Sequence, residues 1–143
     1  MPSVVQAASS SRPAIRALIV GQLAFLGAFL VVLLLYLSRM AVAGVGSAEM
    51  LTGAYDPKDV IPFGDHALNP FFWLYGVVAV LYLAGETLGP PLALVAVVLV
   101  ARKRAVLPRT SRVLLLAGAV GLLLVLVVRF TPLLADMRQW WLD

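Results

Sequence analysis

One acidic residue, Glu86, stands near the middle of a long apolar stretch that covers residues 71–101. A charged side chain at the centre of a bilayer costs about 2.5–3.5 kcal/mol on insertion scales. Glu86 should therefore be protonated, paired, or turned toward water or protein. Tyr82 lies one helical turn before it, in reach of a hydrogen bond, and Thr87 is its neighbour. We interpret Glu86, Tyr82 and Thr87 as a candidate intramembrane site for a proton or an ion.

Two consecutive prolines, Pro90 and Pro91, follow this acid. They remove the amide donors that would pair with the carbonyls of Glu86 and Thr87, so the sequence predicts a kink between Gly85 and Pro91. Unpaired carbonyls beside an acid suit a cation or a water molecule, although neighbouring helices can also satisfy them. Three interpretations stay open: a neutral acid hydrogen-bonded within a packing helix, a proton or ion site, and a ligand or substrate site.

Small residues four positions apart recur in all three apolar stretches of the chain. Such pairs let helices approach closely, and they fit packing within the chain as well as packing against a partner. The predicted helix-packing residues are Gly85 and Gly89, Ala24 and Ala28, and Ala117 and Gly121.

Arg129 lies near the end of the third apolar stretch. With Glu86 at the middle of its own stretch, the helical rise places Arg129 about 15 Å closer to the outer face. We therefore expect no ion pair between Arg129 and Glu86 within one subunit, unless the kink changes their depths. The long side chain of Arg129 is expected to reach the outer headgroups, and a carboxylate of a partner is the alternative.

The rest of the sequence offers few residues for catalysis or metal binding. His66 is the only histidine, and its spacing from Asp65, Asp59 and Glu49 follows no ligand pattern. We expect a loop residue there, with a metal ligand as the alternative. The chain has no cysteine, which excludes disulfides and thiolate sites. Phosphate-binding glycine loops, nucleophile elbows and HExxH motifs do not occur, so we predict no catalytic residue, no metal and no cofactor.

The composition indicates a membrane protein with a single domain. Of the 143 residues, 62% are apolar, against about 45–50% in soluble proteins, and the apolar runs exceed the roughly 18 residues that indicate a bilayer span. We predict an all-α integral membrane protein with three transmembrane helices. The single membrane domain (1–143) has spans at about 14–38, 71–101 and 112–134, an outer loop at about 39–70 and a cytoplasmic basic linker at 102–111.

Local signals refine these boundaries. The first apolar stretch is about 20 residues long, beyond the 7–15 residues of a signal-peptide core, so we interpret it as a span whose helix can run past Arg39. The polar residues 1–13 are expected to be disordered or to lie at the membrane interface. Asn69 and Pro70 indicate the start of the second helix, and the loop has room for a short helix at about 47–53.

Charge predicts the orientation of the three spans. Seven basic residues fall on one side of the predicted membrane with no acid among them: Arg12, Arg16, Arg102, Lys103, Arg104, Arg109 and Arg112. Only four fall on the other side, together with six acids. The positive-inside rule then places the N-terminus in the cytoplasm and the C-terminus outside. Because the basic residues flank apolar spans, they indicate topology or contact with anionic lipid, and no nucleic-acid partner is expected.

The proline pair raises a rival topology, in which residues 71–85 and 90–101 form the two halves of a re-entrant hairpin. Each half would be about 18–22 Å long, short of a hydrocarbon core of roughly 30 Å. The hairpin would also return the basic linker to the outer face, against the charge bias. We favour a single kinked crossing.

These observations favour an accessory, assembly or stabilising subunit of a larger membrane complex, because three helices cannot cover one another completely and no catalytic constellation is present. The alternative is a homo-oligomeric proton or ion channel or transporter component that places several Glu86 side chains around a pathway. A lipid-modifying enzyme ranks third. The expected partners are the lipid bilayer and other membrane subunits. A composition rich in Ala, Gly, Val, Leu, Pro and Arg suggests a bacterial inner membrane as the location.

Overall fold

The computed structural model describes the backbone of residues 4–142 and the side chains of residues 12–142. This part of the chain is all-helical. Its elements are α1 (Val4–Ala43), α2 (Ser47–Met50), one turn of 3-10 helix η1 (Pro57–Val60), α3 (Pro70–Lys103), α4 (Arg109–Val128) and α5 (Pro132–Leu142). Helices α1 (counted from Arg12), α3 and α4 are long and apolar enough to span a membrane. The predicted all-α architecture with three such helices is confirmed.

Helix α3 begins where the sequence predicts, and one side chain explains why. Asn69 is its N-cap: the side-chain oxygen accepts a hydrogen bond from the amide of Phe71 at 3.0 Å, which satisfies an otherwise unpaired donor. Pro70 occupies the first helical position, where its missing amide proton has no cost. The side-chain amide of Asn69 also donates to the carbonyls of Pro62 and Gly64. The same buried residue therefore fixes both the loop and the start of the helix.

Other boundaries differ from the sequence predictions. Helix α1 continues past Arg39 to Ala43, as expected, but residues 4–13 also belong to it rather than to a disordered segment; residues 1–3 lie outside the described part. Helix α4 ends at Val128, before the predicted 134. The cause is Pro132, because proline disfavours helical backbone in the residue before it and supplies no amide donor. Pro132 instead starts α5, so the expected tail is a helix.

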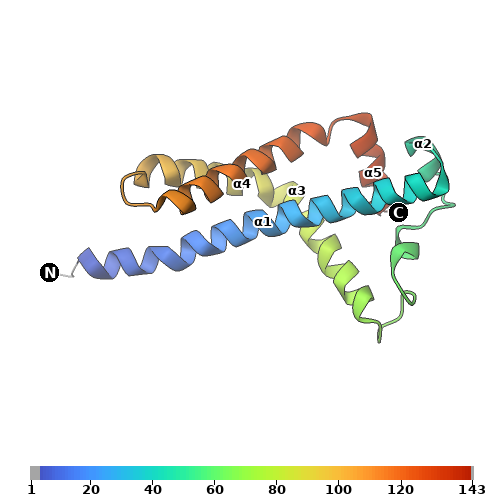
Figure 1. Ribbon diagram of the computed structural model, residues 1–143, viewed down its shortest axis with the longest axis horizontal. Helices are drawn as coiled ribbons and strands as arrows, with labels where there is room; N and C mark the ends of the chain where they lie inside the picture. The colour runs from blue at the N-terminus through green and yellow to red at the C-terminus, as the bar shows by residue number, and fades with distance from the viewer. Residues whose placement is uncertain (1–3, 143) are drawn as a thin grey trace.

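Three helical segments lie side by side: α1, α4 and the C-terminal half of α3 (Figure 1). The N-terminal half of α3, green in Figure 1, diverges from α1 toward the loop that precedes it. Helix α3 is nevertheless continuous through Pro90 and Pro91. The chain therefore does not reverse there, and the re-entrant hairpin is wrong.

The molecule has two ends of different construction. We call the end with the α1–α3 loop (44–69) and α5 the loop end, and the end with the α3–α4 connection (104–108) the linker end. Buried residues form one cluster toward each end. The loop-end cluster is rich in large aromatic side chains, whereas the linker-end cluster contains Ala93, Ala96 and Ala119. Small residues there allow the helix backbones to approach closely.

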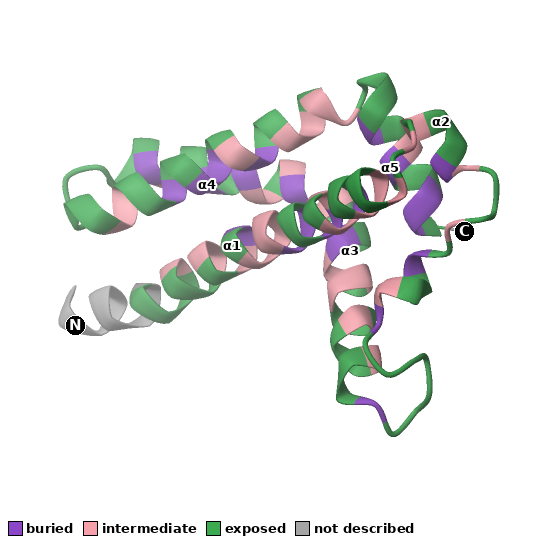
Figure 2. Ribbon diagram, turned by 45° about the vertical axis from the view of Figure 1, so that its right-hand side comes forward, coloured by how far each residue is buried: buried purple, intermediate pink, exposed green. Residues whose placement is uncertain are grey.

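Most of the surface of the three long helices is not covered by the chain itself. In the most apolar window of each candidate span, only 17%, 22% and 22% of the residues are buried. Figure 2 shows short buried segments of the helices interspersed with intermediate and exposed ones. These exposed faces consist largely of Leu and Val side chains, which suits contact with lipid or with other helices.

Candidate functional site

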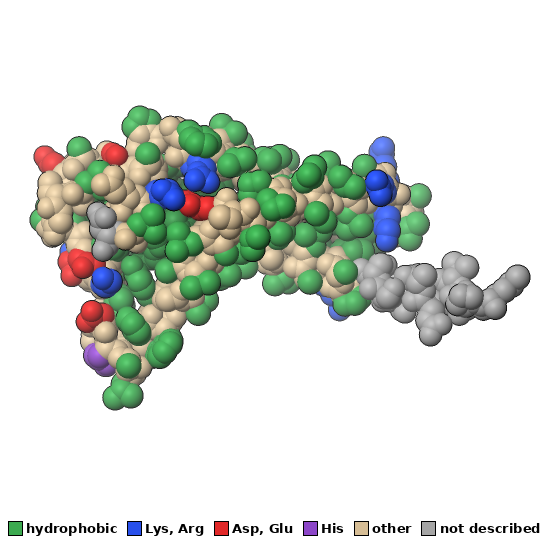
Figure 3. Space-filling model, turned by 180° about the vertical axis from the view of Figure 1, so that it is seen from behind, with side chains coloured by type: hydrophobic (Ala, Val, Ile, Leu, Met, Phe, Trp, Pro, Cys, Tyr) green, Lys and Arg blue, Asp and Glu red, His purple; other side chains and the backbone are tan. Residues whose placement is uncertain are grey.

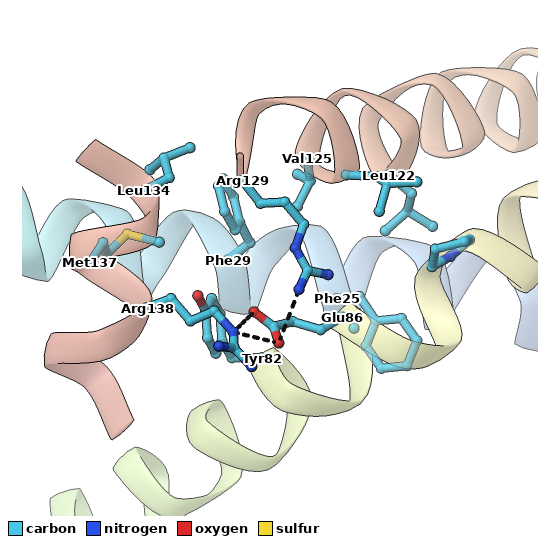
Figure 4. A pocket seen from close by; sticks show the side chains of 13 residues that line it. Phe25, Phe29, Tyr82, Glu86, Leu122, Val125, Arg129, Leu134, Met137 and Arg138 are labelled. Carbon is cyan, nitrogen blue, oxygen red and sulfur yellow. Dashed lines mark hydrogen bonds and ion pairs between the residues drawn. The ribbon is translucent and has the colours of Figure 1, made fainter. Parts of the chain in front are cut away.

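Three charged side chains from three different elements meet at the loop end (Figure 4). Glu86 comes from α3, Arg129 directly follows α4, and Arg138 comes from α5. The Nε atom of Arg138 donates to both carboxylate oxygens of Glu86 at 3.0 Å. A terminal guanidinium nitrogen of Arg129 lies 3.8 Å from Oε2 of Glu86. We call these three residues the charge cluster.

The ion pair between Arg129 and Glu86 overturns the expectation that their depths differ. Measured from the linker end, Glu86 lies 16 residues before Arg102 and Arg129 lies 17 residues after Arg112. At 1.5 Å per residue these distances are about 24 and 26 Å. The two residues are therefore level. The expected separation of about 15 Å came from placing Glu86 at the centre of residues 71–101, whereas the first half of that stretch diverges from the bundle.

Helix α5 brings Arg138 to the cluster by burying one face against the loop end. Trp140 and Trp141 are 1% and 5% exposed. The ring of Trp140 lies 5.3 Å from that of Tyr36 on α1, and the ring of Trp141 lies 4.7 Å from that of Tyr75 on α3. Aromatic pairs at such distances add to the stabilisation from burial. With this face fixed, Arg138 reaches across to Glu86.

Polar contacts also tie α5 to the loop. The hydroxyl of Ser47 on α2 donates to the carboxylate of Asp136 at 2.6 Å. The indole nitrogen of Trp140 donates to the carbonyl of Tyr55, which gives the buried ring a partner for its single donor. Arg138 is the functional residue that the sequence analysis missed, since a short C-terminal segment gave no indication of where it folds back.

The charge cluster carries an excess positive charge and reaches the surface. It pairs one carboxylate with two guanidinium groups. The Glu86 side chain is only 14% exposed, whereas those of Arg129 and Arg138 are 27% and 45% exposed. In Figure 3 an acidic group lies beside two basic groups, with hydrophobic and uncharged groups around them. The arginines therefore shield the acid and present their own charge outward.

A small cavity adjoins the charge cluster. It has a volume of about 30 Å³, and its apolar walls include Phe25, Phe29 and Leu122. Such a volume holds a water molecule or two, but it is far below the several hundred Å³ of typical ligand pockets. The site can hold and orient charges, and it has no room for an organic substrate.

The two neighbours proposed to assist Glu86 lie in different places. Tyr82 is 4% exposed; its ring stacks on Phe29 at 6.4 Å and lines the same cavity as Glu86. Thr87 is exposed, and its hydroxyl donates to the carbonyl of Ala84 in its own helix at 3.1 Å. The structure therefore brings Tyr82 to the charge cluster, whereas Thr87 faces away.

The small residues around Glu86 pack within the chain. A Cβ atom added to Gly85 would lie 3.2 Å from Cβ of Phe25 on α1, and one added to Gly89 would lie 3.4 Å from a methyl group of Leu122 on α4. Both glycines thus allow close approach of a neighbouring helix. On α1, Ala28 is buried and Ala24 is half-buried.

The seam between α1 and α4 lies one residue away from its expected position. Ala117 is exposed, and Gly118 takes the inward position together with Gly121. A Cβ atom on Gly118 would lie 2.6 Å from Oε1 of Gln22, and one on Gly121 would lie 2.9 Å from a methyl group of Leu26. Gln22 is 1% exposed; its side-chain nitrogen donates to a backbone carbonyl of α4 at 3.5 Å. Gly118 and Gly121 are three residues apart, so a search for small residues at a spacing of three as well as four would have indicated the face of α4 that packs on α1.

The remaining candidates form no common site. His66 and Asp65 are exposed in the loop. Asp59 pairs instead with Arg39 at 2.9 Å. Among the described residues, no group of three or more His, Cys, Asp or Glu side chains is placed to hold a metal ion.

The linker end is basic and has no acidic counterpart. Arg102, Lys103, Arg104 and Arg109 are exposed, and Arg112 is half-buried. Figure 3 shows basic groups at this end and the acidic groups of the surface at or near the other. The sequence has no acid between residues 87 and 135 or before residue 49. No ion pair within the described side chains neutralises these cations.

The three long apolar helices indicate a multi-pass membrane protein, and the charge cluster lies at one end of it. The chain matches no protein-family model, no curated protein and no solved structure.

Proposed function

We propose that the protein is a non-catalytic accessory, assembly or stabilising subunit of a larger membrane complex. The observation that carries this proposal is the charge cluster. Both oxygens of Glu86 accept from Arg138, and Arg129 lies within 3.8 Å. The most conspicuous acid of the spans thus holds the chain's own helices together. The adjoining cavity of about 30 Å³ is too small for an organic ligand. The uncovered faces of the long helices are the surfaces available to a partner subunit.

The orientation proposed from charge agrees with this architecture. We propose that the linker end lies on the cytoplasmic side of a cell membrane, in a bacterium the inner membrane, with the loop end and the C-terminus outside. The seven basic residues of the linker end, which have no acid near them in the sequence, then lie inside. The buried Trp and Tyr side chains of the loop end lie near the outer interface, where aromatic side chains are enriched.

A bend in α3 is part of the same proposal. Pro90 and Pro91 remove the amides that would pair with the carbonyls of Glu86 and Thr87, and we propose that α3 is kinked between Gly85 and Pro91. The divergence of its N-terminal half in Figures 1 and 2 supports this. The charge cluster then lies about 24–26 Å from the linker cations, close to the outer boundary of a hydrocarbon core of roughly 30 Å. Charges are less costly there than at the midplane.

Native mass spectrometry from a mild detergent tests the subunit proposal. Purification of the tagged protein from its native membrane should yield a mass that includes at least one different membrane protein. A lone monomer would sink the proposal. Val80→Trp and Leu94→Trp then locate the contact along α3, because both side chains are about two-thirds exposed and lie on opposite halves of this helix. Loss of the partner in one variant and its retention in the other would assign the contact to one half of α3.

Transport remains the alternative, and one observation favours it. The cavity beside Glu86 has room for a water molecule, and water beside a carboxylate is a component of proton pathways. In this case reconstituted Glu86→Gln protein should lose proton or cation flux. Glu49→Gln is the matched control, because Glu49 is an exposed loop acid outside the charge cluster. Flux that is absent in the parent, or unchanged in Glu86→Gln, would exclude this alternative.

A further inference from the structure

A basic recess lies at the linker end, between residues 12–16 of α1 and the α3–α4 connection. Its volume is about 470 Å³. Its polar lining consists of Arg12, Arg16, Lys103 and Ser111, and Ile15 and Leu107 contribute to its apolar lining. The three cations come from two different helices, and no acid lines the recess. We call it the headgroup recess.

An apolar groove continues from this recess along the bundle. It has a volume of about 660 Å³ and runs between α1 and α3, with Leu18 on one side and Leu92 and Leu99 on the other. Ile15 and Lys103 line both the recess and the groove, so the two spaces adjoin. From Lys103 to Leu92 the groove extends over 11 residues, or about 16 Å. This matches the roughly 15 Å occupied by one leaflet of the hydrocarbon core.

We propose that the headgroup recess and the groove together bind one anionic phospholipid. The phosphate lies among Arg12, Arg16 and Lys103 and accepts a hydrogen bond from the hydroxyl of Ser111. One acyl chain follows the groove toward Leu92. Guanidinium groups suit phosphate because several of their donors point in one plane. A soluble anion or an acidic protein segment would account for the basic recess alone. A phospholipid accounts for both spaces, because its phosphate fits the recess and its acyl chain fits the apolar groove. The site does not depend on the proposed subunit function.

A second basic groove at the same end supplies a matched control. It lies between α3 and α4, with a volume of about 500 Å³, and Arg104, Arg109 and Arg112 line it. Its α3 wall reaches only from Arg104 to Val97, about 11 Å. Its charge is equal to that of the headgroup recess, but its apolar wall is shorter than a leaflet. Removing two positive charges from either groove therefore tests whether the lipid binds at a defined site. At a defined site only the change in the headgroup recess weakens binding, whereas general surface attraction would fall equally in both variants.

The test measures lipid retention by native mass spectrometry, with phosphatidylglycerol and phosphatidylcholine of identical acyl chains added to the detergent-purified protein. The parent should retain one phosphatidylglycerol per chain in preference to phosphatidylcholine. Arg12→Gln with Arg16→Gln should weaken this binding roughly 30-fold, at about fivefold for each cation near an anionic surface. Arg104→Gln with Arg109→Gln should change it less than about threefold, because neither residue lines the headgroup recess and salt screens their attraction at longer range. The pair Arg12→Lys and Arg16→Lys, which keeps the charge, should restore most of the binding.

A second variant tests the groove without altering charge. Ala17 lines the groove and is exposed, so Ala17→Phe fills the space while leaving the helix seams intact. It should lower phosphatidylglycerol retention, and glycerophosphoglycerol or inorganic phosphate should not compete with the lipid. Equal losses in the two arginine pairs, equal retention of both lipids, or displacement of the lipid by the chain-free headgroup would each overturn the proposal.

Discussion

The two ends of the molecule treat charge in opposite ways. At the loop end, Glu86 pairs with two arginines, Arg39 pairs with Asp59, and Asp136 accepts from a serine hydroxyl. At the linker end, basic residues lie around the α3–α4 connection and at positions 12 and 16 of α1. The sequence has no acid near them. All the ion pairs among the described side chains therefore lie at the loop end, and under our proposal the cations of the linker end take their anion from a lipid.

Arginine side chains therefore have different roles at the two ends. Arg138 stabilises the fold, because it joins α5 to α3 across a partly buried contact. We expect Arg12 and Arg16 to contribute little to the fold, because they are exposed and line an open recess. A substitution at the loop end should therefore change stability first, and one at the linker end should change lipid binding first. The following predictions test that division, from the largest effect to the smallest.

Trp140→Ala should have the largest effect, because it removes the anchor of α5. The ring is 1% exposed, packs on Tyr36 and donates to the carbonyl of Tyr55. We expect a loss of about 3 kcal/mol in the free energy of unfolding, typical of a buried tryptophan replaced by alanine. Denaturation in mixed micelles, followed by circular dichroism, measures it. Trp73→Ala is the control, since Trp73 is 62% exposed; an equal loss there would show that α5 does not hold the loop end together.

Glu86→Ala should follow, with a loss of about 2 kcal/mol. Removal of one partner from a buried ion pair costs about 3–5 kcal/mol, and the exposure of Arg138 reduces that figure. A double-mutant cycle with Arg138→Ala should give a coupling of about 1 kcal/mol, above that of a cycle with Arg129→Ala, whose contact is longer. Additive effects in the Arg138 cycle would contradict the charge cluster as a stabilising contact.

Salt should weaken lipid binding at the linker end much more than it changes the stability of the loop end. Raising the ionic strength from 0.1 to 1 M shortens the Debye length from about 10 to about 3 Å. Phosphatidylglycerol retention at the linker end should fall at least about fivefold, because its cations are exposed. The free energy of unfolding should change by less than about 0.5 kcal/mol, since Glu86 is shielded by the arginines. If lipid retention did not change with salt, the exposed cations of the linker end would not be what binds the lipid.

Asp59→Asn should have the smallest effect, although it removes an ion pair at the loop end. Arg39 and Asp59 are 30% and 52% exposed, and exposed pairs contribute about 0–1 kcal/mol. We expect a change of about 0.5 kcal/mol or less in the same unfolding assay, with Asp65→Asn as a control of equal charge change. A loss as large as that of Glu86→Ala would mean that exposure does not decide the strength of these pairs.

The sequence was sufficient to predict the three long helices and the start of α3, because their signals are local. Each span is an apolar run, and the start of α3 follows from a capping asparagine and a proline at the first position. The short helix in the loop also appears within the expected residues, as α2 (Ser47–Met50). These features depend on residues within one turn of each other, so no knowledge of the packing is needed.

The charge cluster was only partly accessible from the sequence. The pairing of Glu86 with Arg129 follows if both are counted from the shared basic linker, but not if Glu86 is centred in its apolar run. Leu134, Met137 and Trp141 follow a helical period, which indicates that α5 is an amphipathic helix. The partner of Arg138 could not be predicted, because it depends on the direction of the turn between α4 and α5, which is set by long-range packing.

The position of α5 has a consequence for the order of synthesis. Arg138 follows Glu86 by 52 residues along the chain, which a ribosome takes roughly 3–10 s to add at 5–20 residues per second. Glu86 is therefore synthesised several seconds before its main partner, Arg138. The linker end, in contrast, needs no later segment to assemble once α4 has been made. Until α5 is made, Arg129 is the only member of the charge cluster available to Glu86, and the closer contact at 3.0 Å forms last.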